Sequence, residues 1–218
     1  MIVVVDYGMG NLRSVSKALE SLGAPVRVSS DPQEVAKAAK LILPGVGAFP
    51  AAMRELAARQ LIDPLKASIA KGVPYLGICL GLQLLFERGE EGQGAAGLGI
   101  LQGVVKRFSF SLQPVPGSQI QNPKSKIQNL KIPHMGWNQV TINQKQCPLL
   151  KDVPDQSFVY FVHSYYADPA DRSVVALETD YGGAFTAMVW RDNLYAAQFH
   201  PEKSQAVGLQ LLKNFVEL

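Results

Sequence analysis

The sequence predicts an α/β fold with a mostly parallel central sheet, flanking helices and an added antiparallel part. In the first hundred residues, short apolar segments alternate with segments of helical periodicity. Near-continuous apolar strands separated by helices are typical of a parallel sheet that is covered on both faces. From Leu98 onward, strand-like segments follow one another with little helix between them, which indicates an antiparallel extension of the sheet.

The elements expected in the first half begin with a strand at residues 2–5. Asn11 can cap a helix with Leu12, Val15 and Leu19 on its apolar face, ended by Gly23. Further strands are expected at residues 26–29, 41–43 and 75–78, with helices from residue 32, over 50–58, before residue 75, and over 80–86. In the second half, strands are expected at residues 104–108, 139–142, 158–162, 174–178, 184–190 and 194–199, followed by a helix over 204–216.

The length of 218 residues suits one domain spanning residues 1–218. Residues 109–131 stand out because they are polar and contain three prolines and a near-repeat, Ser-Gln-Ile-Gln-Asn followed by Ser-Lys-Ile-Gln-Asn. Such a segment has too few large apolar residues to bury. We therefore expect a flexible surface insertion there.

Composition excludes several classes of protein. The net charge of +3 is small and Lys and Arg are scattered, so nucleic-acid binding is unsupported. The two cysteines, Cys79 and Cys147, show neither a disulfide framework nor metal-ligand spacing, and we expect no metal or cofactor. Cys147 is expected to be incidental in a polar loop. The N-terminus lacks the features of a signal peptide and no apolar run suits a membrane span, so a cytoplasmic protein is expected.

Cys79 is the first candidate for chemistry. An apolar strand ends at this residue, a helix follows it, and Gly77 and Gly81 flank it as Gly-x-Cys-x-Gly. This is the spacing of a nucleophile elbow, in which the side chain is exposed at the carboxyl edge of a sheet. The N–H groups at the start of the following helix favour a thiolate. A buried, inert cysteine is the alternative.

His200 and Glu202 supply the remaining groups of a catalytic triad. His200 ends the apolar run Leu-Tyr-Ala-Ala-Gln-Phe-His, and Pro201 stops the strand there. Glu202 is placed to hold the imidazole from behind, which gives a Cys-His-Glu arrangement. The other interpretation of His-Pro-Glu is an ordinary strand-to-helix turn. A third segment, Leu-Ile-Leu-Pro-Gly-Val-Gly-Ala-Phe at residues 41–49, predicts a loop whose N–H groups receive an oxyanion, with an ordinary strand-to-helix loop as the alternative.

These three motifs, in this order, resemble the class I, triad-type glutamine amidotransferases, and the resemblance spans nearly the whole chain. It implies the fold of that family and hydrolysis of L-glutamine to L-glutamate and ammonia. It also implies Cys79, His200 and Glu202 as catalytic residues and Gly45, Val46, Gly47 and Leu80 as the oxyanion hole. Glutamine-binding roles follow for Gln83, Glu91, His163, Ser164 and Tyr165, although His163 is expected to act structurally rather than as a second base.

Residues 5–11, 133–138 and 160–166 narrow the resemblance to the glutaminase subunits of imidazole glycerol phosphate synthases, which serve histidine biosynthesis. That resemblance implies a heterodimer with a (β/α)8-barrel cyclase subunit. The cyclase uses the ammonia to form imidazole glycerol phosphate and aminoimidazole carboxamide ribotide. Asn11, Trp137, Tyr160 and Lys203 match interface positions, with a core aromatic as the alternative for Trp137. It further implies a weak glutaminase that is allosterically stimulated once the partner carries its ligand.

Three alternatives share some of these features. The chain could be the glutaminase subunit of another pathway, such as anthranilate, pyridoxal phosphate or guanine nucleotide synthesis, since all share the triad. It could be a different hydrolase with an elbow cysteine, or a binding subunit with a vestigial thiol. The 5–11 and 133–138 motifs, together with Gln83 and His-Pro-Glu, favour the histidine-pathway glutaminase.

Overall fold

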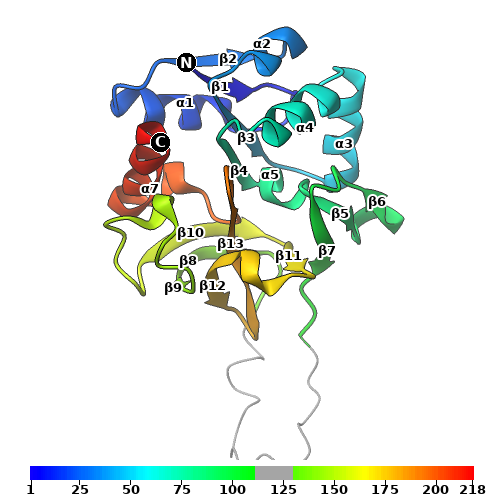
Figure 1. Ribbon diagram of the computed structural model, residues 1–218. Helices are drawn as coiled ribbons and strands as arrows, with labels where there is room; N and C mark the ends of the chain where they lie inside the picture. Colours follow the sequence, from blue (N-terminus) through cyan, green and yellow to red (C-terminus); the bar gives the residue numbers. More distant parts are fainter. Residues whose placement is uncertain (111–129) are drawn as a thin grey trace, which may run out of the picture.

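The computed structural model describes residues 1–110 and 130–218. Its centre is an eight-stranded sheet (Figure 1). The strands, in sheet order, are β2 (Val26–Ser29), β1 (Ile2–Val5), β3 (Lys40–Gly45), β4 (Tyr75–Cys79), β14 (Leu194–Ala197), β13 (Ala184–Arg191), β12 (Val175–Asp180) and β9 (Thr141–Ile142). Neighbours from β2 to β14 are parallel, and those from β14 to β9 are antiparallel. The predicted mostly parallel sheet with an antiparallel part is confirmed.

Helices cover both faces of the central strands (Figure 1). On one face lie α1 (Leu12–Ser21) and α7 (Gln205–Glu217); on the other lie α2 (Pro32–Ala36), α3 (Phe49–Ala58) and α4 (Ile62–Ala70). Strand β1 shows why the strand sequence is continuously apolar: Ile2 and Val4 pack on the α1 side, while Val3 and Val5 pack on the α3 side. Alternate side chains point to opposite faces, so a strand buried on both faces needs apolar residues throughout.

Two smaller sheets adjoin the carboxyl ends of the central strands. One pairs β10 (Phe158–His163) with β8 (His134–Gln139), and the other has the order β11 (Tyr165–Pro169), β7 (Leu101–Arg107), β5 (Phe86–Gly89) and β6 (Ala95–Ala96). Short helices complete the described chain: α5 (Leu80–Gln83), η1 (Glu91–Gln93), η2 (Pro148–Leu150), η3 (Arg172–Val174) and η4 (Pro201–Lys203). Strand β10 lies opposite the end of β4 and the residues that follow β14, and β11 contacts α5.

Several local expectations were wrong. The expected helix over 80–86 ends at Gln83, and strand β5 begins at Phe86. The backbone carbonyls that follow Gln83 accept hydrogen bonds from a later segment of the chain; for example, Leu98 N donates to Leu84 O at 2.8 Å. This long-range pairing overrides local helix propensity. Asn11 occupies the N-cap position of α1, yet its side chain makes no capping hydrogen bond. Strands β6 and β11 were not expected, and the strand expected at 139–142 is two strands, β8 and β9, of which β8 begins at His134.

Cys147 lies at the end of a polar loop, as expected, but its side chain is buried in the core beside η2. Burial raises the pKa of its thiol to about 11. The insertion expected at 109–131 falls mostly on residues 111–129, which lie outside the described residues.

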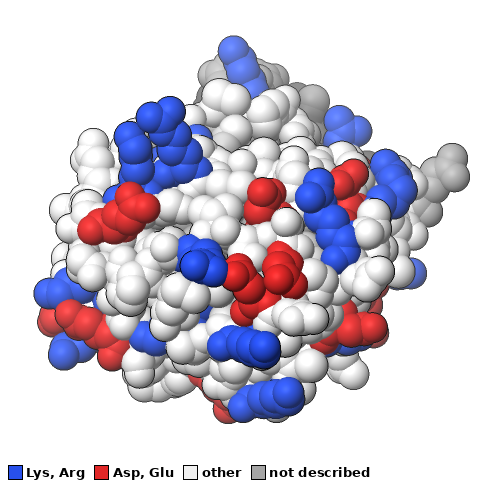
Figure 2. Space-filling model, turned by 90° about the horizontal axis from the view of Figure 1, so that it is seen from above, with Lys and Arg blue, Asp and Glu red and all other residues white. Residues whose placement is uncertain are grey.

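Charges of both signs are interspersed on the face seen from above (Figure 2). This pattern agrees with the small net charge of +3. Among the described residues, no helix combines the length and apolar character needed to cross a membrane. Within residues 1–110 and 130–218, no group of three or more His, Cys, Asp or Glu side chains is arranged so that it could hold a metal ion.

Candidate active site

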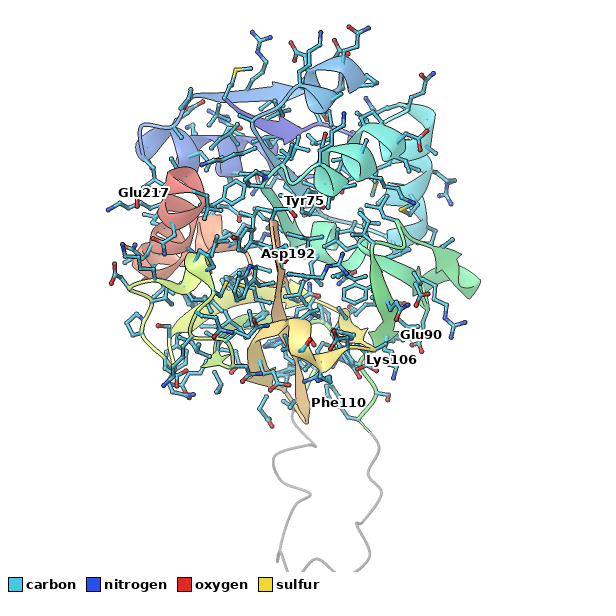
Figure 3. The ribbon with its side chains drawn as sticks, viewed as in Figure 1. Tyr75, Glu90, Lys106, Phe110, Asp192 and Glu217 are labelled. Carbon is cyan, nitrogen blue, oxygen red and sulfur yellow. The ribbon has the colours of Figure 1, made fainter. Side chains whose placement is uncertain are left out.

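Cys79 lies at the point where β4 ends and α5 begins. Its φ of 55° and ψ of −107° belong to a region that residues with a side chain rarely adopt, and such strain is common at functional sites. The flanking glycines permit it: a Cβ at Gly81 would overlap the carbonyl of Leu43 in β3, and one at Gly77 would lie 2.6 Å from the carbonyl oxygen of Gly81. Tyr75, at the start of β4 (Figure 3), donates a hydrogen bond from its hydroxyl to Gly81 O at 3.2 Å.

A cavity of about 300 Å³ opens beside the sulfur of Cys79. It brings together most of the site residues expected from sequence. The lining residues among them are Val46, Gly47, Cys79, Leu80, Gln83, Glu91, His163, Ser164, Tyr165 and His200. Pro133 and Val162 complete the lining. Segments that are far apart in the sequence therefore meet at the carboxyl ends of β3, β4 and β14, where ligands bind in open α/β sheets.

His200 reaches this cavity from the segment after β14. Its Nδ1 lies 2.8 Å from Glu202 Oε1, and both side chains are almost completely buried. Burial alone would lower the pKa of His200, but its interactions with Cys79 and Glu202 outweigh burial and raise the pKa to about 9. The other ring nitrogen, Nε2, is buried and has no hydrogen-bond partner within the described residues. The imidazole is thus held on its Nδ1 side and free on the side that can exchange a proton.

The backbone around His200 is fixed by β10. His200 N donates to Tyr160 O at 2.9 Å, and Ser204 Oγ donates to His200 O at 2.7 Å. Tyr160 N in turn donates to Ser204 Oγ at 3.0 Å. The Lys203 ammonium lies 5.7 Å from the centroid of the Tyr160 ring, and the Tyr160 and Trp137 rings are 6.0 Å apart. Three of the four expected interface residues therefore form one cluster directly behind His200.

Asn11, the fourth expected interface residue, lies at the start of α1. Helix α1 packs against η4, the short helix that contains Lys203. The side chain of Asn11 is partly exposed.

The loop expected to receive an oxyanion follows β3 directly. Gly45 pairs with Cys79 across the sheet, so the loop starts level with the sulfur. Val46 is exposed at 42%, and Gly47 has a φ of 95°, which favours glycine. Gly45 itself does not line the cavity; a Cβ there would overlap the hydroxyl of Tyr7. The structure thus brings Val46, Gly47 and Leu80 to the cavity and places Gly45 behind them.

Glu91 and Gln83 both make internal contacts as well as lining the cavity. Glu91 Oε2 accepts a hydrogen bond from Phe49 N at 2.6 Å, so it holds the first turn of α3 after the oxyanion loop. Gln83 Nε2 donates to Tyr165 O at 2.9 Å and to Gln198 Oε1 at 3.0 Å. A carboxylate at a helix N-terminus is favoured by the free N–H groups and the helix dipole, so Glu91 has a clear structural role.

His163 is buried and pairs with another buried histidine. Its Nε2 lies 3.0 Å from His134 Nδ1, and its Nδ1 lies 2.8 Å from Tyr165 O. Burial lowers the pKa of His163 to about 3 and that of His134 to about 4. A group that stays neutral and has both ring nitrogens engaged cannot readily serve as a base, which fits the structural role expected for His163.

Sequence reasoning missed two residues near the sulfur. Gln198 Nε2 lies 3.6 Å from Cys79 Sγ, and the side chain is fully buried. A polar residue inside the apolar run at 194–199 was the available signal. Tyr7 is also fully buried, and its hydroxyl has no partner within the described residues. Burial, together with the nearby charge of Cys79, raises its pKa. The 5–11 motif, which contains Tyr7, gave no indication that the tyrosine would lie near the Cys79 sulfur.

Comparison with known proteins defines the class of protein. The family model "Glutamine amidotransferase class-I" matches residues 3–218. Among solved structures, one described as a glutamine amidotransferase superposes with a TM-score of 0.70 at 17% identity and covers 100% of both chains. PurLQS from Thermotoga maritima also gives a TM-score of 0.70 at 17% identity, over 99% of this chain and 96% of that one. The chain is a class-I glutamine amidotransferase, an enzyme, and the fold class expected from the sequence is confirmed.

Curated relatives narrow the family further. The imidazole glycerol phosphate synthase subunit HisH of Syntrophotalea carbinolica is 51% identical over 218 residues, with 100% of both chains covered. The HisH subunit of Thermosynechococcus vestitus is 51% identical over 218 residues, covering 100% of this chain and 96% of the relative. Within the class-I glutamine amidotransferases, the chain belongs to the HisH family. The resemblance expected from residues 5–11, 133–138 and 160–166 is confirmed.

Proposed function

We propose that the chain hydrolyses L-glutamine through Cys79, His200 and Glu202 and supplies the ammonia to a cyclase subunit in histidine biosynthesis. One observation carries the chemistry: a strained elbow cysteine shares a cavity with an imidazole whose Nδ1 is 2.8 Å from a buried carboxylate. The names of the HisH relatives support the pathway. The alternatives of an unrelated hydrolase and of a non-enzymatic subunit lose their basis, because the family is that of an enzyme.

The sulfur attacks the side-chain amide carbon of glutamine and forms a tetrahedral adduct. His200 holds the proton that the thiol gives up, because its pKa of about 9 favours the charged imidazolium at neutral pH. It then passes this proton to the departing ammonia. Water attacks the resulting thioester, with His200 as the base, and glutamate leaves. Glu202 keeps the imidazole in one orientation and stabilises its positive charge.

Stabilisation of the oxyanion is assigned to the N–H of Leu80 and to the 45–47 loop. Leu80 opens α5, so its N–H is one of the free donors at a helix N-terminus. Loss of one oxyanion donor typically lowers turnover by about 100-fold to 1,000-fold. Gln83, Glu91, Ser164 and Tyr165 line the cavity and are assigned to glutamine binding, with His163 supporting Tyr165 from behind.

The partner is proposed to dock on an exposed apolar face of the β8–β10 sheet, which we call the aromatic face. It consists of Met135, Trp137, Phe158 and Tyr160. The exposed fractions are 63% for Met135, 45% for Trp137 and 53% for Phe158, which is unusual for such large apolar side chains. The opposite side of the same sheet is buried. Tyr160 O accepts the N–H of His200, so a partner that binds this face contacts a residue that is hydrogen-bonded directly to the triad.

The test measures glutamate release by the purified chain alone, and then with a (β/α)8-barrel cyclase subunit and its ribulosyl nucleotide ligand. We expect strong stimulation only in the complete mixture, and no hydrolysis in a Cys79→Ala variant that still binds the cyclase. Hydrolysis that survives in Cys79→Ala would refute the triad. A Cys79-dependent basal rate without stimulation would favour another amidotransferase pathway. The cytoplasmic location expected from the sequence stays a prediction.

A further inference from the structure

Gln198 occupies a position that the triad does not explain. It follows β14 directly, two residues before His200, and its side chain is fully buried. Its backbone N–H donates to Ala187 O at 2.8 Å, which fixes the residue to β13. Its amide nitrogen lies 3.6 Å from Cys79 Sγ. A buried amide in contact with the reacting sulfur has a cost unless its polar atoms are satisfied, so its partners define what it does.

The neighbours of Gln198 decide which end of its amide faces the sulfur. A backbone carbonyl can only accept, so Tyr165 O fixes Nε2 of Gln83 on its side at 2.9 Å. The same Nε2 then directs its second hydrogen to Gln198 at 3.0 Å, and only the carbonyl oxygen of Gln198 can receive it. The N–H₂ end of Gln198 is therefore the end that faces Cys79.

Tyr165 O also accepts a second hydrogen bond, from His163. The imidazole of His163 donates to it from Nδ1 at 2.8 Å, which leaves Nε2 of the neutral ring as an acceptor. His134 donates to that nitrogen from its Nδ1 at 3.0 Å, so its own Nε2 accepts from Asn138 Nδ2 at 3.3 Å. Asn138 Nδ2 is identified as the donor end because it also reaches Asp180 O at 2.9 Å. Donors therefore reach Tyr165 O from both sides, from His163 and from Gln83, and every contact from Asn138 to Cys79 joins one donor to one acceptor without conflict.

We propose that Gln198 binds the thiolate of Cys79 through its amide N–H, and that Gln83 is the positioning residue that holds Gln198 in this orientation. This inference rests on the proposed function, because it assigns Cys79 as the nucleophile. A hydrogen bond to the charged form of a group favours that form. In this arrangement the Gln198 amide stabilises a thiolate relative to a thiol and fixes the position of the sulfur before glutamine arrives. Val162 O, 3.9 Å from Sγ, offers no donor and cannot substitute.

The experiment follows alkylation of Cys79 by iodoacetamide between pH 5 and pH 10, which needs neither glutamine nor the cyclase. Other titratable groups facing the site are Tyr7, His163, His200 and Glu91, and the variants retain all of them. Cys147 is buried with a raised pKa, and a Cys79→Ala sample serves as the blank. In Gln198→Met, which keeps the chain length but lacks a donor, we expect the midpoint of the rate profile to move up by about one pH unit or more.

Gln144→Met is the matched control, because Gln144 also donates through Nε2 to a backbone carbonyl, that of Ser173, but does not line the cavity. We expect its profile to match the unmodified chain. Gln83→Met frees the Gln198 amide to rotate but leaves Gln198 itself in contact with the sulfur. We therefore expect a smaller upward shift of the alkylation midpoint than in Gln198→Met. Thermal unfolding identifies which variants fold.

An unchanged midpoint in a folded Gln198→Met variant overturns the inference. If that variant does not fold, an unchanged midpoint in Gln83→Met does the same. The result is separable from the proposed function, since retained glutamine hydrolysis in Cys79→Ala would refute the triad whatever the alkylation profiles show.

Discussion

At the scale of single residues, the charge state of His200 decides both chemistry and pH behaviour. Its pKa in the folded chain is about 9, above the value near 6.5 expected when unfolded. The folded state therefore holds the proton more tightly, and the protonated imidazole stabilises the fold. This contribution is full below about pH 6.5 and is lost as the pH rises through about 9.

Glu202→Gln tests this assignment. The variant keeps the shape of the side chain but removes the negative charge next to Nδ1, so the pKa of His200 should fall and the base should lose its orientation. We expect turnover of glutamine to drop by about 100-fold to 10,000-fold. NMR titration of the imidazole should give a lower midpoint than in the unmodified chain.

The control for this variant is Glu178→Gln, which breaks the ion pair of Glu178 with Arg172 on the surface. It should leave both turnover and the His200 titration unchanged. A Glu202→Gln enzyme with normal turnover would show that the carboxylate is not needed to orient the imidazole.

At the scale of elements, the β4–α5 elbow depends on close contact with β3. The hydrogen on Gly81 leaves room for the Leu43 carbonyl, and no side chain would. We expect Gly81→Ala to lower the free energy of unfolding by about 1–3 kcal/mol through overpacking, measured by denaturant unfolding. It should also displace the sulfur and reduce glutamine turnover.

Gly10→Ala is the comparison for Gly81→Ala. A Cβ at Gly10 would lie 3.4 Å from Pro44 O, an ordinary contact distance, and should change stability little. Equal stability of the two variants would contradict the role of the β3 contact.

The sequence predicted elements best where local pattern and tertiary contacts agree. Strand β1 is fixed by its apolar run, and the predicted bounds of 2–5 match the structure. The stretch after Gln83 was assigned wrongly because its carbonyls bond with residues 98–101, a pairing that local periodicity does not encode. The motif residues Cys79 and His200 were found from sequence, whereas Gln198 was missed because its significance comes from the distance to a sulfur 119 positions away.

At the scale of the whole molecule, two apolar cores lie on opposite faces of one sheet, and the site lies at the edge where the small sheets close over it. The prediction that residues 1–218 form one domain stays a prediction. The side chains labelled in Figure 3 illustrate the arrangement: Tyr75 lies in the interior, while Lys106 on β7 and Glu90, directly after β5, lie at the periphery. The aromatic face belongs to the two-stranded sheet, in which Tyr160 O accepts the N–H of His200.

Replacement of Trp137 by Ala tests this face as the docking surface. Aromatic side chains that are exposed in the free subunit and buried on binding often supply much of the binding energy. Calorimetry with the cyclase subunit should show a Kd raised by about 10-fold or more, equivalent to about 1.4 kcal/mol or more. The unfolding temperature should stay unchanged, because Trp137 is 45% exposed and leaves no core cavity. Val28→Ala, on the edge strand β2 and 43% exposed, is the matched control and should bind normally. Normal affinity in Trp137→Ala would place the partner elsewhere and would remove the proposed route from the interface, through Tyr160, to His200.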